Sequence, residues 1–501
     1  METLGRLVAL FLAVATFLSL TMAIISGINP DPNGGQGPPD EYQHLSAARY
    51  YVNHWLPPQV GDPATISSYS RGHGLSYIND PDPVYPLAGK YAALLSPLVT
   101  NFDLSLRLFN VTLFGILAGL CFLRPTSWHL FLPLLISPQV WYIFSYFNGD
   151  ALPLFLSVLI LYQLAHPESL LNRYLDREGF IRGGGAVLFC GVLVALLLLS
   201  KKNYLVLLAM LPAGMAILRL GILPGLLLAM FAIGSAAVHL GWLSISQDAL
   251  PWLAGIAGLG TLLAIFLPTS TRAVRGRIVL KLAALALVAG TIAQSRSVLD
   301  AVVYGSNTQK QVAVVELQEQ LAQPGFKPSQ VYAPKKTPDA WYNIYYGLDL
   351  RARGTPLENL FAPPWDWHIK SFQSFTGQYG WLNITGPTAY YVAIGIGYAL
   401  LLAIYAAAVA RSGDKQAWAM LGVITLLSAL TVAISVHHSW HNDFQAQGRY
   451  LFPILPMLGL GLYSVSRYVS RVITLSLFAA CFALSAWSFI FIGLMQIPRS
   501  F

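Results

Sequence analysis

The sequence predicts an all-α polytopic membrane protein. Of its 501 residues, 55% are hydrophobic and only 10% are charged, a composition that excludes an ordinary soluble globular domain. Apolar segments close to the ~20 residues that a helix needs to cross the hydrocarbon core recur along the chain. The period-2 pattern of barrel strands is absent, so helices are the only structures that would satisfy the backbone inside a membrane.

About thirteen spans are expected from hydropathy. The first, near 7–27, is too long for the apolar core of a signal peptide, so we expect it to be retained as a helix. The others lie near 104–123, 126–146, 151–165, 185–200, 203–218, 221–243, 250–267, 278–296, 389–410, 416–436, 450–466 and 472–494.

The basic residues indicate an orientation. With the N-terminus in the cytoplasm, the inner ends of the spans carry most of the arginines, which is the positive-inside pattern. These residues are scattered singly between apolar segments, so the net charge of +8 reflects topology and contact with membrane lipids. Nucleic acid is not an expected partner.

This orientation places two long loops outside. The expected organisation is an N-terminal transmembrane module over 1–296 that includes the first extracytoplasmic loop, 28–103. An extracytoplasmic cap loop over 297–388 and C-terminal transmembrane helices over 389–501 follow. The first loop begins with the turn-rich stretch from Asn29 to Gly35.

Two helices are expected within the loops. Asp40 to Trp55 has the pattern of an amphipathic helix lying along the membrane interface. In the cap loop, Glu316 to Ala322 predicts one or two helical turns.

Ionisable residues follow the first span directly. Asp40, Glu41 and His44 lie a dozen residues beyond it, where we expect the membrane–water interface. Charged groups held against a membrane are costly, so such a cluster marks a candidate site for chemistry or transport. Asp40 could instead serve only as a helix N-cap.

Other polar groups fall on the same outer side. Asp150 lies in the turn after 126–146, where it could also act as a helix cap. Lys201 and Lys202 break the positive-inside pattern in a short turn, which suggests anion binding, although both could reach lipid phosphates instead. Arg449 opposes the dipole at the start of a helix, so a bound anion would explain its position.

Three histidines, His437, His438 and His441, precede this arginine. Their spacing is compatible with metal ligands, but histidines in a wet loop are more often ordinary loop residues. We therefore expect no metal ligand among the site residues. No cofactor is indicated, and a divalent cation is left open.

Carboxylates and cations at an outer membrane surface suit glycosyl transfer from a lipid-phosphate sugar. A carboxylate would take the proton of the acceptor hydroxyl as it attacks the anomeric carbon. Arginine and lysine would stabilise the negative charge that grows on the departing phosphate. No nucleotide-binding fold is needed, because the isoprenoid tail delivers the donor through the bilayer.

Five segments of the chain can be compared with known families. In order they are Pro38-Pro39-Asp40-Glu41-Tyr42-Gln43-His44, Asn148-Gly149-Asp150-Ala151, Leu199-Ser200-Lys201-Lys202-Asn203-Tyr204, Ser374-Phe375-Thr376-Gly377-Gln378-Tyr379-Gly380-Trp381-Leu382 and Gln447-Gly448-Arg449-Tyr450-Leu451-Phe452-Pro453. They resemble segments of GT-C integral-membrane glycosyltransferases and, more closely, of the bacterial domain-of-unknown-function 2142 family. Their shared order and sidedness carry the resemblance over about residues 1–470.

The resemblance implies a GT-C-like bundle in the bacterial inner membrane with its active site at the extracytoplasmic face. It implies a polyprenyl-phosphate sugar donor, a glycan or lipid-linked acceptor and, by analogy, inversion at the anomeric carbon. Asp40 would be the base with Glu41 as the alternative, and Asp150 would orient the acceptor or a metal. Lys201, Lys202 and Arg449 would hold the donor phosphate. The expected site residues are Asp40, Glu41 and Asp150 as catalytic groups, and His44, Lys201, Lys202, Gln447, Arg449 and Tyr450 as substrate-binding groups.

Two alternative functions stay open. A transporter or flippase for lipid-linked saccharides would place ionisable residues in mid-span and use discontinuous helices. A polymerase or ligase for lipid-linked saccharides also uses outer arginines but lacks an acidic pair after the first span. Because the ionisable groups here gather at one side, glycosyl transfer is favoured.

Overall fold

The computed structural model describes residues 1–25, 38–70, 72–177, 183–239, 250–266, 272–331 and 348–497. Its described elements are almost all helices, and one small antiparallel ladder pairs β1 (Gln378–Tyr379) with β2 (Ile384–Thr385). The α-helices are α1 Glu2–Ile25, α2 Glu41–Tyr50, α3 Val84–Leu95, α4 Phe102–Leu123, α5 Pro138–Ser145, α6 Ala151–Ala165, α7 Leu170–Asp176, α8 Gly184–Leu199, α9 Val206–Arg219, α10 Ile222–His239, α11 Leu250–Phe266, α12 Arg272–Tyr304, α13 Asn307–Leu321, α14 Pro328–Val331, α16 Trp367–Thr376, α17 Thr388–Ser412, α18 Lys415–His441, α19 Ile454–Val465 and α20 Arg471–Trp487.

Many of these helices are suited to a membrane. Among the described residues, eight helical stretches are long and apolar enough to cross one, which makes the chain an all-α polytopic membrane protein. The count of thirteen spans stays a prediction. The eight stretches are Glu2–Ile25, Phe102–Leu123, Ala151–Asp176, Lys202–Arg219, Ala273–Tyr304, Thr388–Ser412, Lys415–His441 and Arg471–Leu494.

The expectation of one continuous span over 126–146 is wrong. Each of the short helices that replace it carries a proline at its first or second position, and proline removes a backbone donor and breaks a longer helix. Trp128 and Trp141 within this segment are fully buried, so the interruptions are enclosed by protein rather than exposed to lipid. The short helices are η3 Pro125–Leu130, η4 Leu132–Leu135 and α5 Pro138–Ser145.

The loop helices also differ from expectation. The helix expected over Asp40 to Trp55 ends at Tyr50, and α13 is longer than the turns expected from Glu316 to Ala322. The turn-rich stretch from Asn29 to Gly35 lies outside the described residues.

The α12 helix runs through the domain boundary that we expected at 296. Its 33 residues span about 50 Å, well beyond a hydrocarbon core of ~30 Å. At its far end, the Tyr304 hydroxyl donates a hydrogen bond to the carbonyl of Pro58 in the first long loop. The cap therefore rests directly on that loop.

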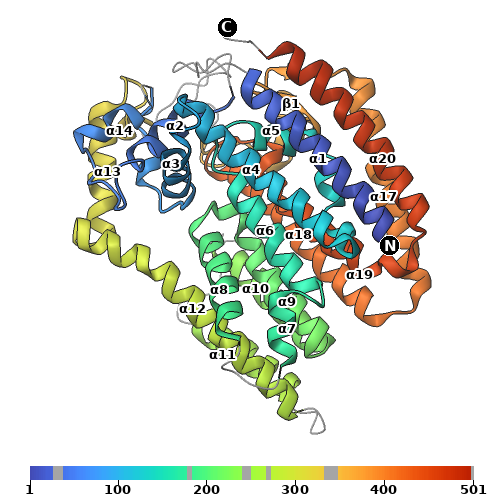
Figure 1. Ribbon diagram of the computed structural model, residues 1–501. Coiled ribbons are helices and arrows are strands. Elements are labelled where there is room, and N and C mark those ends of the chain that lie inside the picture. The colour runs from blue at the N-terminus through green and yellow to red at the C-terminus, as the bar shows by residue number, and fades with distance from the viewer. Residues whose placement is uncertain are drawn as a thin grey trace.

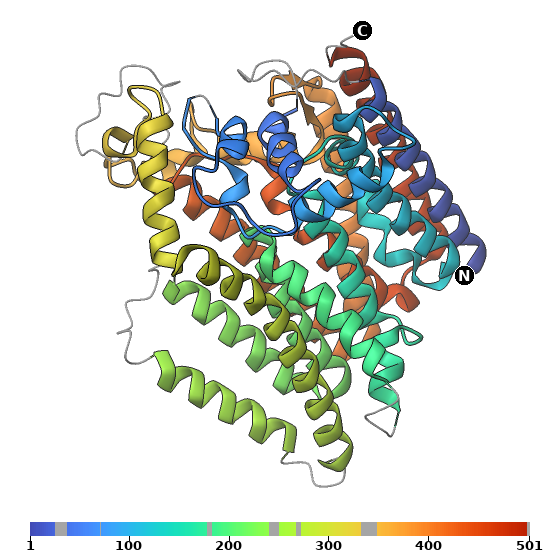
Figure 2. The ribbon, with the colours of Figure 1, turned by 60° about the vertical axis from the view of Figure 1, so that its left-hand side comes forward.

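Ion pairs join helix ends that the sequence assigned to the same inner side. Arg124 pairs with Glu168 at 2.7 Å, and Arg219 pairs with Asp176 at 2.6 Å. Arg467 contacts Asp414 in the same way. Figures 1 and 2 show α2, α3 and α13 gathered at the opposite end of the bundle. Loops that are distant in the sequence can therefore meet there, and we call this the site end.

Candidate active site at one end of the bundle

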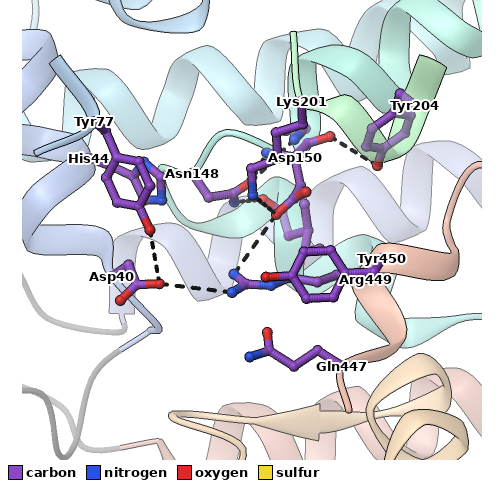
Figure 3. Close-up of polar contacts among 12 residues, drawn as sticks. Asp40, His44, Tyr77, Asn148, Asp150, Lys201, Tyr204, Gln447, Arg449 and Tyr450 are labelled. Atoms are coloured by element: carbon purple, nitrogen blue, oxygen red, sulfur yellow. Dashed lines mark hydrogen bonds and ion pairs between the residues drawn. The ribbon is translucent and has the colours of Figure 1, made fainter. Parts of the chain in front are cut away.

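Four segments bring charged side chains together at the site end, as Figure 3 shows. The Arg449 guanidinium lies 3.8 Å from the Asp40 carboxylate and 3.9 Å from the Asp150 carboxylate. The Lys201 ammonium contacts Asp150 Oδ2 at 2.7 Å. Asp40 precedes α2, Asp150 precedes α6, Lys201 follows α8 and Arg449 precedes α19. Two cations and two carboxylates thus form one connected cluster.

Asp40 presents its carboxylate to this cluster. It occupies the N-cap position of α2, but its side chain makes no capping hydrogen bond. Capping therefore does not explain its position. Its backbone adopts a left-handed φ of 57°, a region that aspartate tolerates better than most residues. Tyr77 donates a hydrogen bond to Asp40 Oδ2 at 3.3 Å, and the side chain keeps 27% of its surface exposed.

A turn built by Asn148 positions Asp150. The Asn148 side-chain oxygen accepts hydrogen bonds from the backbone N–H groups of Asp150 and Ala151 at 2.8 and 3.2 Å. The Asp150 side chain makes no cap of its own, so the capping alternative does not account for it either. It is fully buried, and within the described structure its Oδ1 has no hydrogen-bond partner. A buried carboxylate oxygen without a partner is costly unless a ligand supplies one.

The two adjacent lysines have different surroundings. Lys201 bonds to Asp150 with 22% of its side chain exposed, whereas Lys202 is exposed to solvent. The Tyr204 hydroxyl donates to the Asp150 carbonyl at 3.4 Å and is fully buried, so it anchors the turn that carries both lysines. Of the two, Lys201 belongs to the charged cluster.

The loop that carries Arg449 packs closely against the backbone of the Ser374–Leu382 segment. The Gly448 N–H donates to the Ser374 hydroxyl at 2.7 Å, and a Cβ on Gly448 would stand only 2.2 Å from the Phe375 nitrogen. The Ser374–Leu382 segment therefore supports the loop beneath Arg449. Arg449 is only 8% exposed, and in the described structure its Nε and Nη1 atoms lack hydrogen-bond partners.

His44 lies beside the cluster in an aromatic pocket. Its ring stacks on Tyr77 with centroids 4.0 Å apart, and its Nδ1 is 2.8 Å from the Tyr85 hydroxyl. Burial lowers the pKa of His44 well below its usual value, helped by the nearby charges of Lys201 and Arg449. The imidazole is therefore neutral near pH 7. Its Nε2 is buried and has no partner among the described residues.

Asp82 is a site residue that sequence reasoning missed. It is 7% exposed, and its Oδ1 accepts a hydrogen bond from the Val84 N–H at 3.0 Å. Burial raises the pKa of Asp82 to about 7, although that hydrogen bond and the charge of Lys201 both lower it. The sequence Asp80-Pro81-Asp82-Pro83 indicates only a turn before a helix. Tyr77 and Tyr85 could not be singled out as site residues from the sequence, because the first long loop contains several tyrosines.

Glu41 faces away from the cluster. Both of its carboxylate oxygens bond to the Arg107 guanidinium, at 2.7 and 2.6 Å, and neither side chain has exposed surface. Glu41 Oε1 also accepts the Phe147 N–H at 3.0 Å. A carboxylate held in this way is not placed to accept a proton from a substrate, so the geometry favours Asp40 as the base.

Gln447 and Tyr450 extend the site along one loop. Gln447 donates to Gln445 Oε1 at 2.6 Å, and Gln445 donates to Asp443 Oδ2 at 2.6 Å. The Tyr450 ring lies 5.5 Å from the Arg449 guanidinium carbon. In Figure 3, Gln447 lies on the opposite side of Arg449 from Lys201. This row of amides forms a polar edge beside the charged cluster.

The three histidines expected in a loop lie instead in the last turns of α18. Within the described part of the chain, no group of three or more histidine, cysteine, aspartate or glutamate side chains is arranged to hold a metal ion.

Residues 355–458 match the family described as a predicted membrane protein, DUF2142. The match covers the cap helix α16, the α17 and α18 helices and the loop with Arg449. No curated protein and no solved structure shows a significant match to the chain. The match supports membrane location, and of the charged cluster it includes Arg449 but not Asp40, Asp150 or Lys201.

Proposed function

We propose that the chain is a membrane glycosyltransferase that moves a sugar from a polyprenyl-phosphate donor to a glycan or lipid-linked acceptor. The carrying observation is the cluster of Asp40, Asp150, Lys201 and Arg449, assembled from four separate segments at one end of the bundle. In this proposal that end lies outside the cytoplasm of a bacterial inner membrane, the orientation that the positive-inside pattern favours.

Asp40 supplies the base. Tyr77 and Arg449 both contact its Oδ2, so Oδ1 is the oxygen that would take the proton of the acceptor hydroxyl. The acceptor oxygen then forms a bond to the anomeric carbon as the bond from that carbon to the phosphate oxygen breaks. The phosphate leaves with the bonding electron pair. Attack opposite the leaving group inverts the anomeric carbon.

Arg449 stabilises the departing phosphate. A phosphodiester donor gains a negative charge as it becomes a phosphate monoester, and a preorganised guanidinium stabilises that charge without rearranging. The Nε and Nη1 atoms of Arg449 are buried and make no hydrogen bond in the described structure, although Nη1 lies 3.9 Å from Asp150 Oδ2, so both have hydrogen bonds to offer to phosphate oxygens. His44 Nε2 is also buried without a hydrogen-bond partner among the described residues.

Transport of a lipid-linked sugar is less well supported. Arg107 in α4 and Lys281 in α12 are ionisable and fully buried. Arg107 is occupied by Glu41, and Lys281 donates to the carbonyls of Tyr174 and Arg177 at the end of α7. Both are engaged in structural contacts, so neither resembles a group that carries a substrate or proton across the membrane.

The test is transfer by the purified protein in lipid, with a polyprenyl-phosphate sugar and a cell-envelope glycan acceptor. Asp40→Asn should reduce transfer by at least about 100-fold, since it removes a positioned base. The variant should insert and melt like the wild type because Asp40 makes no capping bond. Wild-type product levels from this variant would remove the base assignment.

A further inference from the structure

Lys201 contacts one buried carboxylate, Asp150, and lies near a second, Asp82. Its Nζ contacts Asp150 Oδ2 at 2.7 Å. The place where a Gly149 Cβ would stand is 3.1 Å from Lys201 Cε and 3.4 Å from Asp82 Oδ2. Lys201 Cε and Asp82 Oδ2 therefore both border the space that a side chain at Gly149 would occupy, and the absence of that side chain leaves room for them.

Two carboxylates at a buried site need a compensating positive charge. Asp82 is 7% exposed and Asp150 is fully buried, and like charges in a medium of low dielectric constant repel strongly. A divalent cation is one common solution, because Mg²⁺ and Mn²⁺ prefer carboxylate oxygens. An ammonium group on a long side chain is another, and it is always present.

We propose that Lys201 takes the place of a divalent cation beside Asp150 and Asp82, so that the chain carries its own cation for glycosyl transfer. This inference rests on the proposed function for its role in catalysis, but the position of the cation does not. The ammonium would offset the carboxylate charge beside Arg449, so that Arg449 remains available to the leaving phosphate.

Two further observations fit a cation position. The Asp150 Oδ1 atom is buried without a partner in the described structure, so Asp150 has an unused oxygen that a metal could bind if the ammonium were removed. The turn that carries Lys201 is fixed by Tyr204, which bonds to the Asp150 backbone. The ammonium is thus delivered by a rigid turn rather than by a free surface side chain.

The first experiment measures Mn²⁺ binding to purified protein without any donor, by calorimetry or by the paramagnetic resonance of free Mn²⁺. Lys201→Ala should create one Mn²⁺ site that the wild type lacks, and Lys201→Ala combined with Asp82→Asn should lose it. Lys201→Gln, which keeps more of the side-chain volume, serves if the alanine variant does not fold. Lys415→Ala is the matched control, since Lys415 is an exposed lysine at the opposite end. Mn²⁺ binding that is unchanged by the loss of Lys201 would overturn the proposal.

The second experiment measures transfer. The wild type should keep its activity in EDTA. Lys201→Ala should lose about 100-fold, the usual cost of removing one preorganised electrostatic group, and Mg²⁺ or Mn²⁺ should restore at least about tenfold of it. Wild-type transfer that EDTA abolishes and Mg²⁺ restores would overturn the proposal. If no polyprenyl-phosphate sugar supports transfer but Lys201→Ala gains its Mn²⁺ site, the glycosyltransferase proposal falls and the cation position stands.

Discussion

Glu41 and Arg107 form a buried ion pair with two hydrogen bonds, at 2.7 and 2.6 Å, and neither side chain is exposed. Arg107 lies in α4, so the pair ties the first turn of α2 to a membrane helix. Arg107 also donates to the Ala23 carbonyl at 3.1 Å, near the end of α1. The residue next to Asp40 in the chain therefore fixes the direction from which Asp40 enters the site.

Loss of this pair should reduce stability more than it alters the site chemistry. Glu41→Gln leaves the Arg107 charge buried without its partner, which typically costs about 3–5 kcal/mol. We expect a large drop in the thermal unfolding temperature in detergent, while Asp40→Asn melts close to the wild type. If Glu41→Gln kept wild-type stability and lost only transfer, Glu41 would instead be the base.

Arg449 should act mainly on the donor. Arg449→Ala removes the guanidinium that contacts both carboxylates, and we expect binding of a polyprenyl phosphodiester to weaken by about 30-fold, or ~2 kcal/mol. Arg449→Lys keeps the positive charge but loses the planar guanidinium, which can donate two parallel hydrogen bonds to a phosphate. It should therefore recover only part of that affinity. The acceptor KM should change little.

The control for these variants is Arg467→Ala. Arg467 is 66% exposed in its pair with Asp414 at the opposite end, where a surface ion pair contributes little. Unchanged donor affinity in Arg449→Ala would remove the phosphate role.

Donor binding should weaken as the pH rises through 7. Burial raises the pKa of Asp82 to about 7, so this carboxyl is mostly neutral at pH 6 and mostly ionised at pH 8. With Asp82 neutral, Asp40 and Asp150 balance Lys201 and Arg449. Ionisation of Asp82 adds one negative charge next to this balanced cluster and should oppose an anionic donor.

We expect about fivefold weaker binding at pH 8 than at pH 6, or roughly 1 kcal/mol. A phosphodiester probe is the suitable ligand, because its own charge does not change over this range. Asp82→Asn, which cannot ionise, should flatten the profile. A fall of the same size in Asp82→Asn would assign the effect to another group.

The sequence predicted the helical membrane architecture and most of the charged cluster. Asp40, Asp150, Lys201 and Arg449 could be found because each is an ionisable residue next to an apolar segment, and the orientation put all four at one side. The broken segment at 126–146 was missed because hydropathy sums apolar residues and takes no account of where prolines interrupt a helix.

Finer assignments needed three-dimensional contacts. Asp40 and Glu41 are neighbours of the same chemical type, and only the partner of Glu41, Arg107, distinguishes them. Lys201 and Lys202 differ only in which one faces Asp150. Asp82 looked like a turn residue, because its burial depends on packing between segments that are distant in the chain.

The close contact between Gly448 and the Phe375 backbone can be tested as the feature that positions Arg449. A Cβ at position 448 would stand 2.2 Å from the Phe375 nitrogen and 2.3 Å from its Cα, and backbone atoms cannot move aside cheaply. Gly448→Ala should therefore displace the loop that carries Arg449, with a cost of about 1–3 kcal/mol in stability and a clear loss of phosphodiester affinity.

Gly119→Ala provides the matched comparison for this substitution. Gly119 lies within α4, and nothing stands within 4 Å of its Cβ position. Alanine there should leave binding unchanged and raise stability by up to about 1 kcal/mol, because glycine is unfavourable inside a helix. If both variants bound the donor like the wild type, Arg449 would not depend on the Gly448 approach for its position.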